Sequence, residues 1–131
     1  MRSDDYPYVI HKDVKYSGLT LIDVNALAGS VTDPWYHQTL LRVNDCVVRF
    51  AVVQGEFHWH HHEAEDEFFY VISGELHIDL DDRTVSLRPN HGYMVPHGVR
   101  HRTRAPERTA MLMIAGSGVE PTGDKANASD V

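Results

Sequence analysis

Turn-forming residues recur at short intervals through the middle of the chain, and this spacing constrains the fold most strongly. They stand at Gln54-Gly55, Ser73-Gly74, Asp81-Asp82, Pro89-Asn90, Pro96-His97-Gly98 and Ala105-Pro106. Between them lie short runs rich in β-branched and aromatic residues, at 47–53, 68–72, 76–80, 85–87, 93–95 and 110–114. Short, regularly spaced strands without a long amphipathic helix between them predict an all-β fold, either an antiparallel sandwich, a jelly roll or a small barrel.

Length and composition limit the partners that such a fold could have. The 131 residues are enough for one domain. No apolar run approaches the roughly 20 residues that cross a bilayer, so we expect no membrane partner. A formal net charge of −7 repels phosphate backbones and argues against nucleic-acid binding. The single cysteine, Cys46, can form no internal disulfide, which is typical of a reducing compartment and predicts a cytoplasmic location. Because Val47 and Val48 follow it, Cys46 is expected to be a small core residue.

The pattern divides the chain into three parts. Residues 43–115 are predicted to form the barrel. Residues 1–42 are an extension whose strand or strands pack on the barrel or on a dimer partner, and within it 19–27 reads as either a strand or a short helical turn. Residues 116–131 are polar and predict a poorly ordered tail. Small barrels have open strand edges, which predicts a homodimer.

The strongest chemical signal is the segment 57–67, where four histidines fall within five positions and acidic residues follow. On a strand, residues two apart face the same side, so His60 and His62 would aim at one point. Glu67 has the opposite parity, and a tight hairpin through 63–66 would be needed to bring it beside them. Solvated histidines on a charged hairpin tip are the alternative interpretation. The apolar runs on both sides weaken this alternative, because polar side chains facing a core are costly unless they are ligated or hydrogen-bonded.

Two groups of residues resemble the motifs of the cupin superfamily, and in particular of the small single-domain cupins. The first motif reads His60, His62, Glu67 and Gly74, and the second reads Pro96, Gly98 and His101. The sequence departs from the motifs at two glycine positions. Gly55 stands one position closer to His60 than usual, and Asn90 replaces the glycine that leads the second motif. Neither departure removes a ligand. The resemblance covers residues 47–114, about half of the chain.

This resemblance implies a double-stranded β-helix, also called a jelly-roll or cupin barrel. It also implies one divalent metal ion held by His60, His62, Glu67 and His101. Three imidazoles and a carboxylate suit Fe, Mn, Ni, Zn, Co or Cu, and the absence of a thiolate argues against a closed structural zinc site. Alternation along the strand places His101 on one face and the arginines on the other. We expect this outer face, formed by Arg100, Arg102 and Arg104, to be solvated.

An octahedral ion with four protein ligands keeps two positions for substrate or water, which favours a metal-dependent enzyme acting on a small polar molecule. An oxidoreductase of the oxygenase type and a lyase or isomerase both fit. The alternative is a non-catalytic cupin that binds a sugar or a small acid. No catalytic residue is assigned. Arg49, Phe69, Tyr93 and Met113 are expected to line the substrate pocket, with Arg49 placed to clamp a substrate carboxylate.

Overall fold

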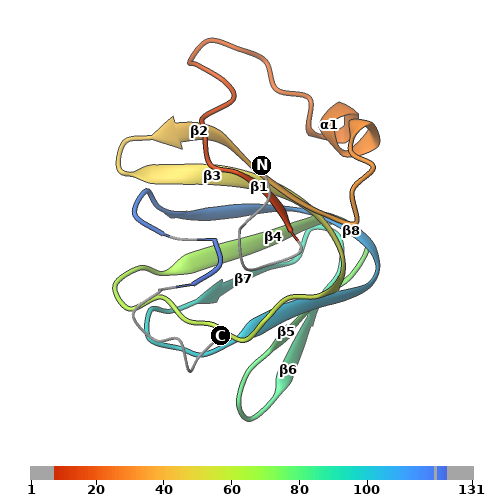
Figure 1. The fold of residues 1–131 in the computed structure, drawn as a ribbon, viewed down its shortest axis with the longest axis vertical. Helices are drawn as coiled ribbons and strands as arrows, with labels where there is room; N and C mark the ends of the chain where they lie inside the picture. Colours follow the sequence, from red (N-terminus) through yellow and green to blue (C-terminus); the bar gives the residue numbers. More distant parts are fainter. Residues whose placement is uncertain (1–7, 120, 124–131) are drawn as a thin grey trace.

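Eight strands and one short helix make up the part of the chain that the computed structural model describes, residues 8–119 and 121–123 (Figure 1). In chain order they are β1 (Val9–His11), α1 (Val24–Ser30), β2 (Trp35–Val43), β3 (Cys46–Glu56), β4 (Glu67–Ser73), β5 (Leu76–Asp79), β6 (Thr84–Leu87), β7 (Gly92–Val95) and β8 (Arg102–Gly116). The prediction of an all-β fold is confirmed. No helix in the described residues is both long and apolar enough to span a bilayer.

Strand β8 organises the sheet, because it pairs with β3, β4 and β5 along its length. The main path of the sheet runs β1-β2-β3-β8-β4-β7, and the β5–β6 hairpin joins it through β8. The turn predicted at Ala105-Pro106 is wrong, since β8 continues through both residues. The β3–β8 register shifts here from Val53–Thr109 to Gly55–Ala105, so the exposed Pro106 lies where β8 has no partner residue on β3 and its missing N–H costs no hydrogen bond of that pairing.

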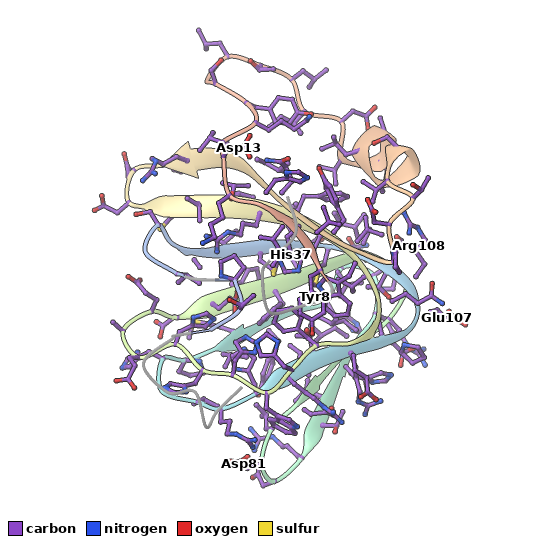
Figure 2. All side chains as sticks on the ribbon, viewed as in Figure 1. Tyr8, Asp13, His37, Asp81, Glu107 and Arg108 are labelled. Carbon is purple, nitrogen blue, oxygen red and sulfur yellow. The ribbon has the colours of Figure 1, made fainter. Side chains whose placement is uncertain are left out.

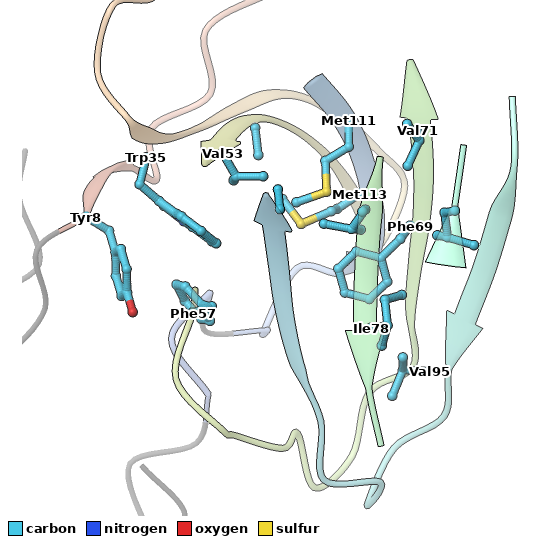
Figure 3. Close-up of a cluster of buried hydrophobic side chains, with 14 of the residues drawn as sticks. Tyr8, Trp35, Val53, Phe57, Phe69, Val71, Ile78, Val95, Met111 and Met113 are labelled. Carbon is cyan, nitrogen blue, oxygen red and sulfur yellow. The ribbon is translucent and has the colours of Figure 1, made fainter. Parts of the chain in front are cut away.

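The apolar core lies inside the barrel, where side chains from opposite strands meet (Figure 3). Alternate residues of β3, β4 and β8 face inward, as period-two alternation requires. Phe69, Val71, Ile78 and Met111 fill the middle of this core, each with 2% or less of its surface exposed. Cys46 is exposed at the start of β3, so the prediction that it lies in the core is wrong. It stands directly after the Asn44-Asp45 turn, before the buried part of the strand begins.

Part of the N-terminal extension, residues 16–31, covers the outer face of the β2–β3–β8 layer, whereas β1 and β2 of the same extension join the sheet itself. A second apolar cluster is centred there on Leu40, Phe50, Val52 and Ala110, and partly buried side chains from residues 16–31 pack against it. Helix α1 begins after Asp23, whose carboxylate accepts a hydrogen bond from Ala26 N at 3.1 Å. In Figure 1 the helix lies beyond the β2–β3 layer, on the side away from the core. The ambiguous stretch 19–27 therefore becomes a loop leading into a short helix.

The arginine stripe lies on the outer face, as alternation predicts, but it is not simply solvated. Arg102 Nε and Arg104 Nε each lie 2.8 Å from Asp79 Oδ2, and Thr84 Oγ1 donates to Asp79 Oδ1 at 2.6 Å. The bond from Arg104 is the main reason that the pKa of Asp79 falls well below its ordinary value; burial opposes the shift, and Thr84 and Arg102 add to it. This network ties the β5–β6 hairpin to β8.

Replacing Asp79 with Asn should lower the free energy of unfolding at pH 7 by about 1 to 3 kcal/mol, because two arginines lose their charged acceptor. A carboxyl group whose pKa falls on folding stabilises the protein above its unfolded pKa of about 3.9, and this contribution disappears as the pH drops through the folded value. Urea unfolding should therefore show a smaller difference at pH 3. The matched control is Asp81→Asn, at the exposed hairpin tip labelled in Figure 2, which should change stability by no more than about 0.5 kcal/mol. Equal effects of the two substitutions would contradict this account.

Candidate metal centre

The four side chains named in the sequence come from three separate pieces of backbone and meet at one point. Glu67 opens β4, whereas His60 and His62 lie in the connection 57–66, outside any named strand. His60 forms an isolated antiparallel bridge with His101, with both N–H···O distances at 2.9 Å. The expected hairpin is not formed, because β3 and β4 both pair with β8 rather than with each other. The bridge to His101 fixes the histidine segment in its place.

The geometry of the cluster is compact, and its side chains are buried. One potential ligand atom from each of the four residues lies within 4.8 Å of all the others, and all four residues are buried. His62 Nε2 lies 3.4 Å from Glu67 Oε1, and His101 Nε2 lies 3.7 Å from the same oxygen. Bonds of 2.0 to 2.2 Å to one ion would place neighbouring donor atoms about 3 to 3.4 Å apart. The two separations from Glu67 Oε1, 3.4 and 3.7 Å, come close to this range.

Backbone carbonyls set the orientation of two imidazole rings. His60 Nδ1 lies 3.0 Å from His58 O, and His101 Nδ1 lies 2.9 Å from Val99 O. A carbonyl oxygen only accepts, so each Nδ1 carries a proton and donates it. In the neutral rings Nε2 then offers a lone pair. An outer hydrogen bond of this kind is the usual way in which proteins hold a metal-binding histidine.

The electrostatics favour the protonation states that a metal ion needs. Burial, and after it the neighbouring His101, lowers the pKa of His60 well below its ordinary value, so this ring is neutral. Burial alone would raise the pKa of Glu67, but the side chains of His101 and His62 outweigh it and the net pKa is lowered. The cluster thus combines a neutral imidazole at His60 with an ionised carboxylate at Glu67.

The donor set itself fits a cation. Glu67 Oε1 and His101 Nε2 are buried and have no hydrogen-bond partner among the described residues. In the neutral tautomer that carries its proton on Nδ1, His101 Nε2 presents a lone pair to the same space as the carboxylate. A divalent ion placed between the two groups would satisfy both atoms. The buried group of three histidines and one glutamate could therefore hold a metal ion.

A cavity opens beside the cluster, inside the barrel. Among its lining residues are Arg49, Phe69 and Met113, three of the four residues predicted for a substrate pocket. The structure does not bring Tyr93 to this cavity. Although Tyr93 pairs with Phe69, it lies on the edge strand β7, packs against the rim of the core and places its hydroxyl 3.5 Å from Arg83 Nη2.

Sequence reasoning missed His37, Thr103 and Pro121, which also line the cavity. Thr103 could have been recognised, because it shares the inward parity of His101. His37 gave no such signal, since it lies in the extension whose strands the pattern left undefined. His37 pairs with Ala51 on β3, which is two residues from Arg49 and faces the same side of the sheet.

The described part of the predicted tail packs against the cavity. Val119 is buried, its carbonyl accepts a hydrogen bond from Arg49 Nη2 at 2.9 Å, and the carbonyl of Thr122 contacts the ring of His58. Gly123 has φ +94°, and a Cβ there would lie 2.6 Å from His60 Cβ. Residues 117–119 and 121–123 therefore differ from the poorly ordered segment that their polar composition predicted; the remaining tail residues lie outside the described part of the chain.

Comparison with known proteins agrees with this geometry. A family model described as the cupin domain matches residues 46–115. The chain belongs to the cupin family. Its barrel is accordingly the double-stranded β-helix that the two motifs predicted, and the fold prediction is confirmed.

Known proteins resemble this cupin over different shares of its length. An uncharacterized Bacillus subtilis protein, YdbB, is 42% identical over 90 residues, which cover 68% of this chain and 80% of that protein. A cupin-2 domain protein from Shewanella frigidimarina has a crystal structure that superposes with a TM-score of 0.69 at 31% identity, covering 72% of this chain and 92% of that one. The polyketide synthase CurC of Streptomyces cyaneus is 47% identical over 45 residues, only 34% of this chain and 29% of that protein.

Proposed function

We propose that this cupin binds one divalent transition-metal ion through His60, His62, Glu67 and His101 and acts as a metal-dependent enzyme on a small polar molecule. The observation that carries the proposal is the convergence of four buried donor atoms beside a cavity that has its own charged and polar lining. A purely structural metal site would have no use for such a cavity. Catalytic metal sites characteristically keep open coordination positions next to a substrate pocket.

A bound ion of this kind would act as a Lewis acid on a substrate oxygen and, if redox-active, would add oxygen chemistry. The protein residues around it would bind and orient the substrate. Phe69, Met111 and Met113 form the apolar wall that excludes water, and Arg49 supplies a buried positive charge. This division between an apolar wall and a charged end suits an oxygenase or a lyase or isomerase acting on a small acid.

The second candidate function is non-catalytic binding of a sugar or small acid in the same cavity. Turnover distinguishes the two. Untagged protein would be loaded with Fe²⁺, Mn²⁺ or Ni²⁺ and incubated with a panel of small hydroxy acids, oxo acids and sugars, while oxygen uptake and product masses are followed. The enzyme hypothesis predicts turnover that is lost in Glu67→Gln. Tight binding of a panel member without any conversion, across all three metals, would favour the binding protein.

Homodimerisation and a cytoplasmic location stay predictions. The dimer is readily checked by sedimentation of the full chain at micromolar concentration, where we expect about twice the monomer mass. A monomer at all concentrations would contradict it.

A further inference from the structure

We propose that His37 is a ligand-binding residue of the cavity, whose Nδ1–H donates a hydrogen bond to an anionic oxygen of the molecule held beside the metal. Arg49 provides the positive charge next to it. The inference rests on the proposed function and narrows its substrate class to small molecules that carry a carboxylate or an enolate oxygen.

The tautomer of His37 follows from its neighbour on β2. Trp35 Nε1 lies 3.1 Å from His37 Nε2, and both residues are buried. An indole N–H can only donate, so His37 Nε2 must accept and the ring proton must sit on Nδ1. The pKa of His37, lowered to about 4 mainly by burial, agrees with a neutral ring; Glu67 opposes this shift and Arg49 adds to it.

Aromatic packing holds this ring in one position. His37 stacks on Phe57 with an interplanar angle of 15°, and Trp35 stacks on the same ring at 17°. Figure 3 shows Trp35, Phe57 and Tyr8 grouped at one end of the core, and Figure 2 labels His37 in the barrel interior. A ring fixed on its Nε2 side and on its face can present only Nδ1 to a ligand.

The proton on Nδ1 has no protein acceptor. Nδ1 is buried and has no hydrogen-bond partner among the described residues, although His37 lines the same cavity as His60 and Glu67. A buried N–H without an acceptor is costly, so such groups in native structures ordinarily meet a ligand or an ordered water. The cavity is the space in which that acceptor would lie.

Charge decides which kind of acceptor fits. Arg49 and Thr39 form a directly opposed pair on β3 and β2, and His37 lies two residues from Thr39 on the same inner face. The guanidinium is held in place by the carbonyl of Val119. A fixed cation beside a neutral donor, facing a metal centre, favours an oxyanion over a neutral hydroxyl.

The first test needs no substitution. Long-range ¹H–¹⁵N correlation spectra of the metal-free wild-type protein should show His37 protonated at Nδ1. Protonation at Nε2 would overturn the inference, because the donor would then point to Trp35 rather than to the cavity.

The second test compares two substitutions that place an amide at different positions. An Asn side chain puts its N–H₂ near the site of Nδ1, whereas Gln puts it near Nε2. In zinc-loaded protein, with metal content checked for each variant, His37→Asn should bind acetate within about threefold of wild type. His37→Gln should bind it about tenfold more weakly or worse, because a hydrogen bond to a charged group is lost.

The outcomes separate the inference from the proposal on which it rests. Wild-type protein that takes up no zinc would contradict the proposed function, and this is seen before acetate is added. Equal acetate affinities in the two zinc-loaded variants would overturn only the inference about His37.

Discussion

Replacing His60 with Ala should reduce the metal content of untagged protein from about one ion per chain to less than a tenth of that. Loss of an outer hydrogen bond to a ligand typically weakens metal binding 10- to 100-fold, so loss of a ligand itself should exceed about 100-fold. The bridge between His60 and His101 is formed by the backbone, so the substitution removes the imidazole of a candidate ligand and leaves the bridge available. Elemental analysis of protein purified without added metal measures the effect and identifies the metal taken up in the cell.

The matched control is His77→Ala. His77 lies on β5 with its Nδ1 2.8 Å from Ser86 Oγ, away from the cluster. This variant should keep its full metal content. Equal metal content in both variants would show that the ion, if any, binds elsewhere.

Replacing Gly74 with Ala should destabilise the fold by at least about 3 kcal/mol, which lowers the melting temperature by about 10 °C. Gly74 has φ +87°, in the left-handed region that other residues enter at a cost. An added Cβ would also lie 2.6 Å from Arg108 O and 2.8 Å from Thr109 Cα, both of them backbone atoms that cannot move without bending β8. The unfavourable backbone angle and the steric overlap of the added Cβ therefore both destabilise the Gly74→Ala protein.

Gly18→Ala is the control for this experiment. No atom lies within 4 Å of a Cβ built at Gly18, and its φ is not in the left-handed region. Thermal unfolding should change little, by less than about 1 kcal/mol. A Gly74→Ala protein as stable as Gly18→Ala would contradict the packing described at the β4–β5 turn.

The sequence predicts the barrel and the candidate site well because both depend on local signals. Turn residues and alternation predict β4 to β7 almost to their ends, and the parity of His101 correctly separates the buried ligand candidate from the outer arginines. The full cluster could be proposed because its residues match the two cupin motifs; alternation alone places Glu67 on the side opposite His60 and His62. The hairpin was wrong because spacing along the chain does not reveal which strand lies between two others, and here β8 separates β3 from β4.

The features that the sequence did not predict depend on contacts between residues far apart in the chain. His37 reaches the cavity only because β2 pairs with β3, and nothing near residue 37 indicates that pairing. The segment around Val119 is polar in composition, yet it is held by Arg49, a residue 70 positions earlier. The composition of a segment indicates how much apolar surface the segment itself can bury. It does not indicate whether a side chain from a distant part of the chain will bind the segment. Likewise, Cys46 is exposed because the strand's buried stretch starts one residue later.

X-ray absorption at the metal edge tests the central claim most directly. For wild-type protein carrying one equivalent of Zn²⁺ or Ni²⁺, we predict a first shell of light atoms near 2.0 to 2.2 Å that includes three imidazole nitrogens and one carboxylate oxygen. The multiple scattering of the imidazole rings should decrease by about a third in any His62→Ala protein that still retains metal. A shell of water oxygens alone, without imidazole scattering, would contradict the account.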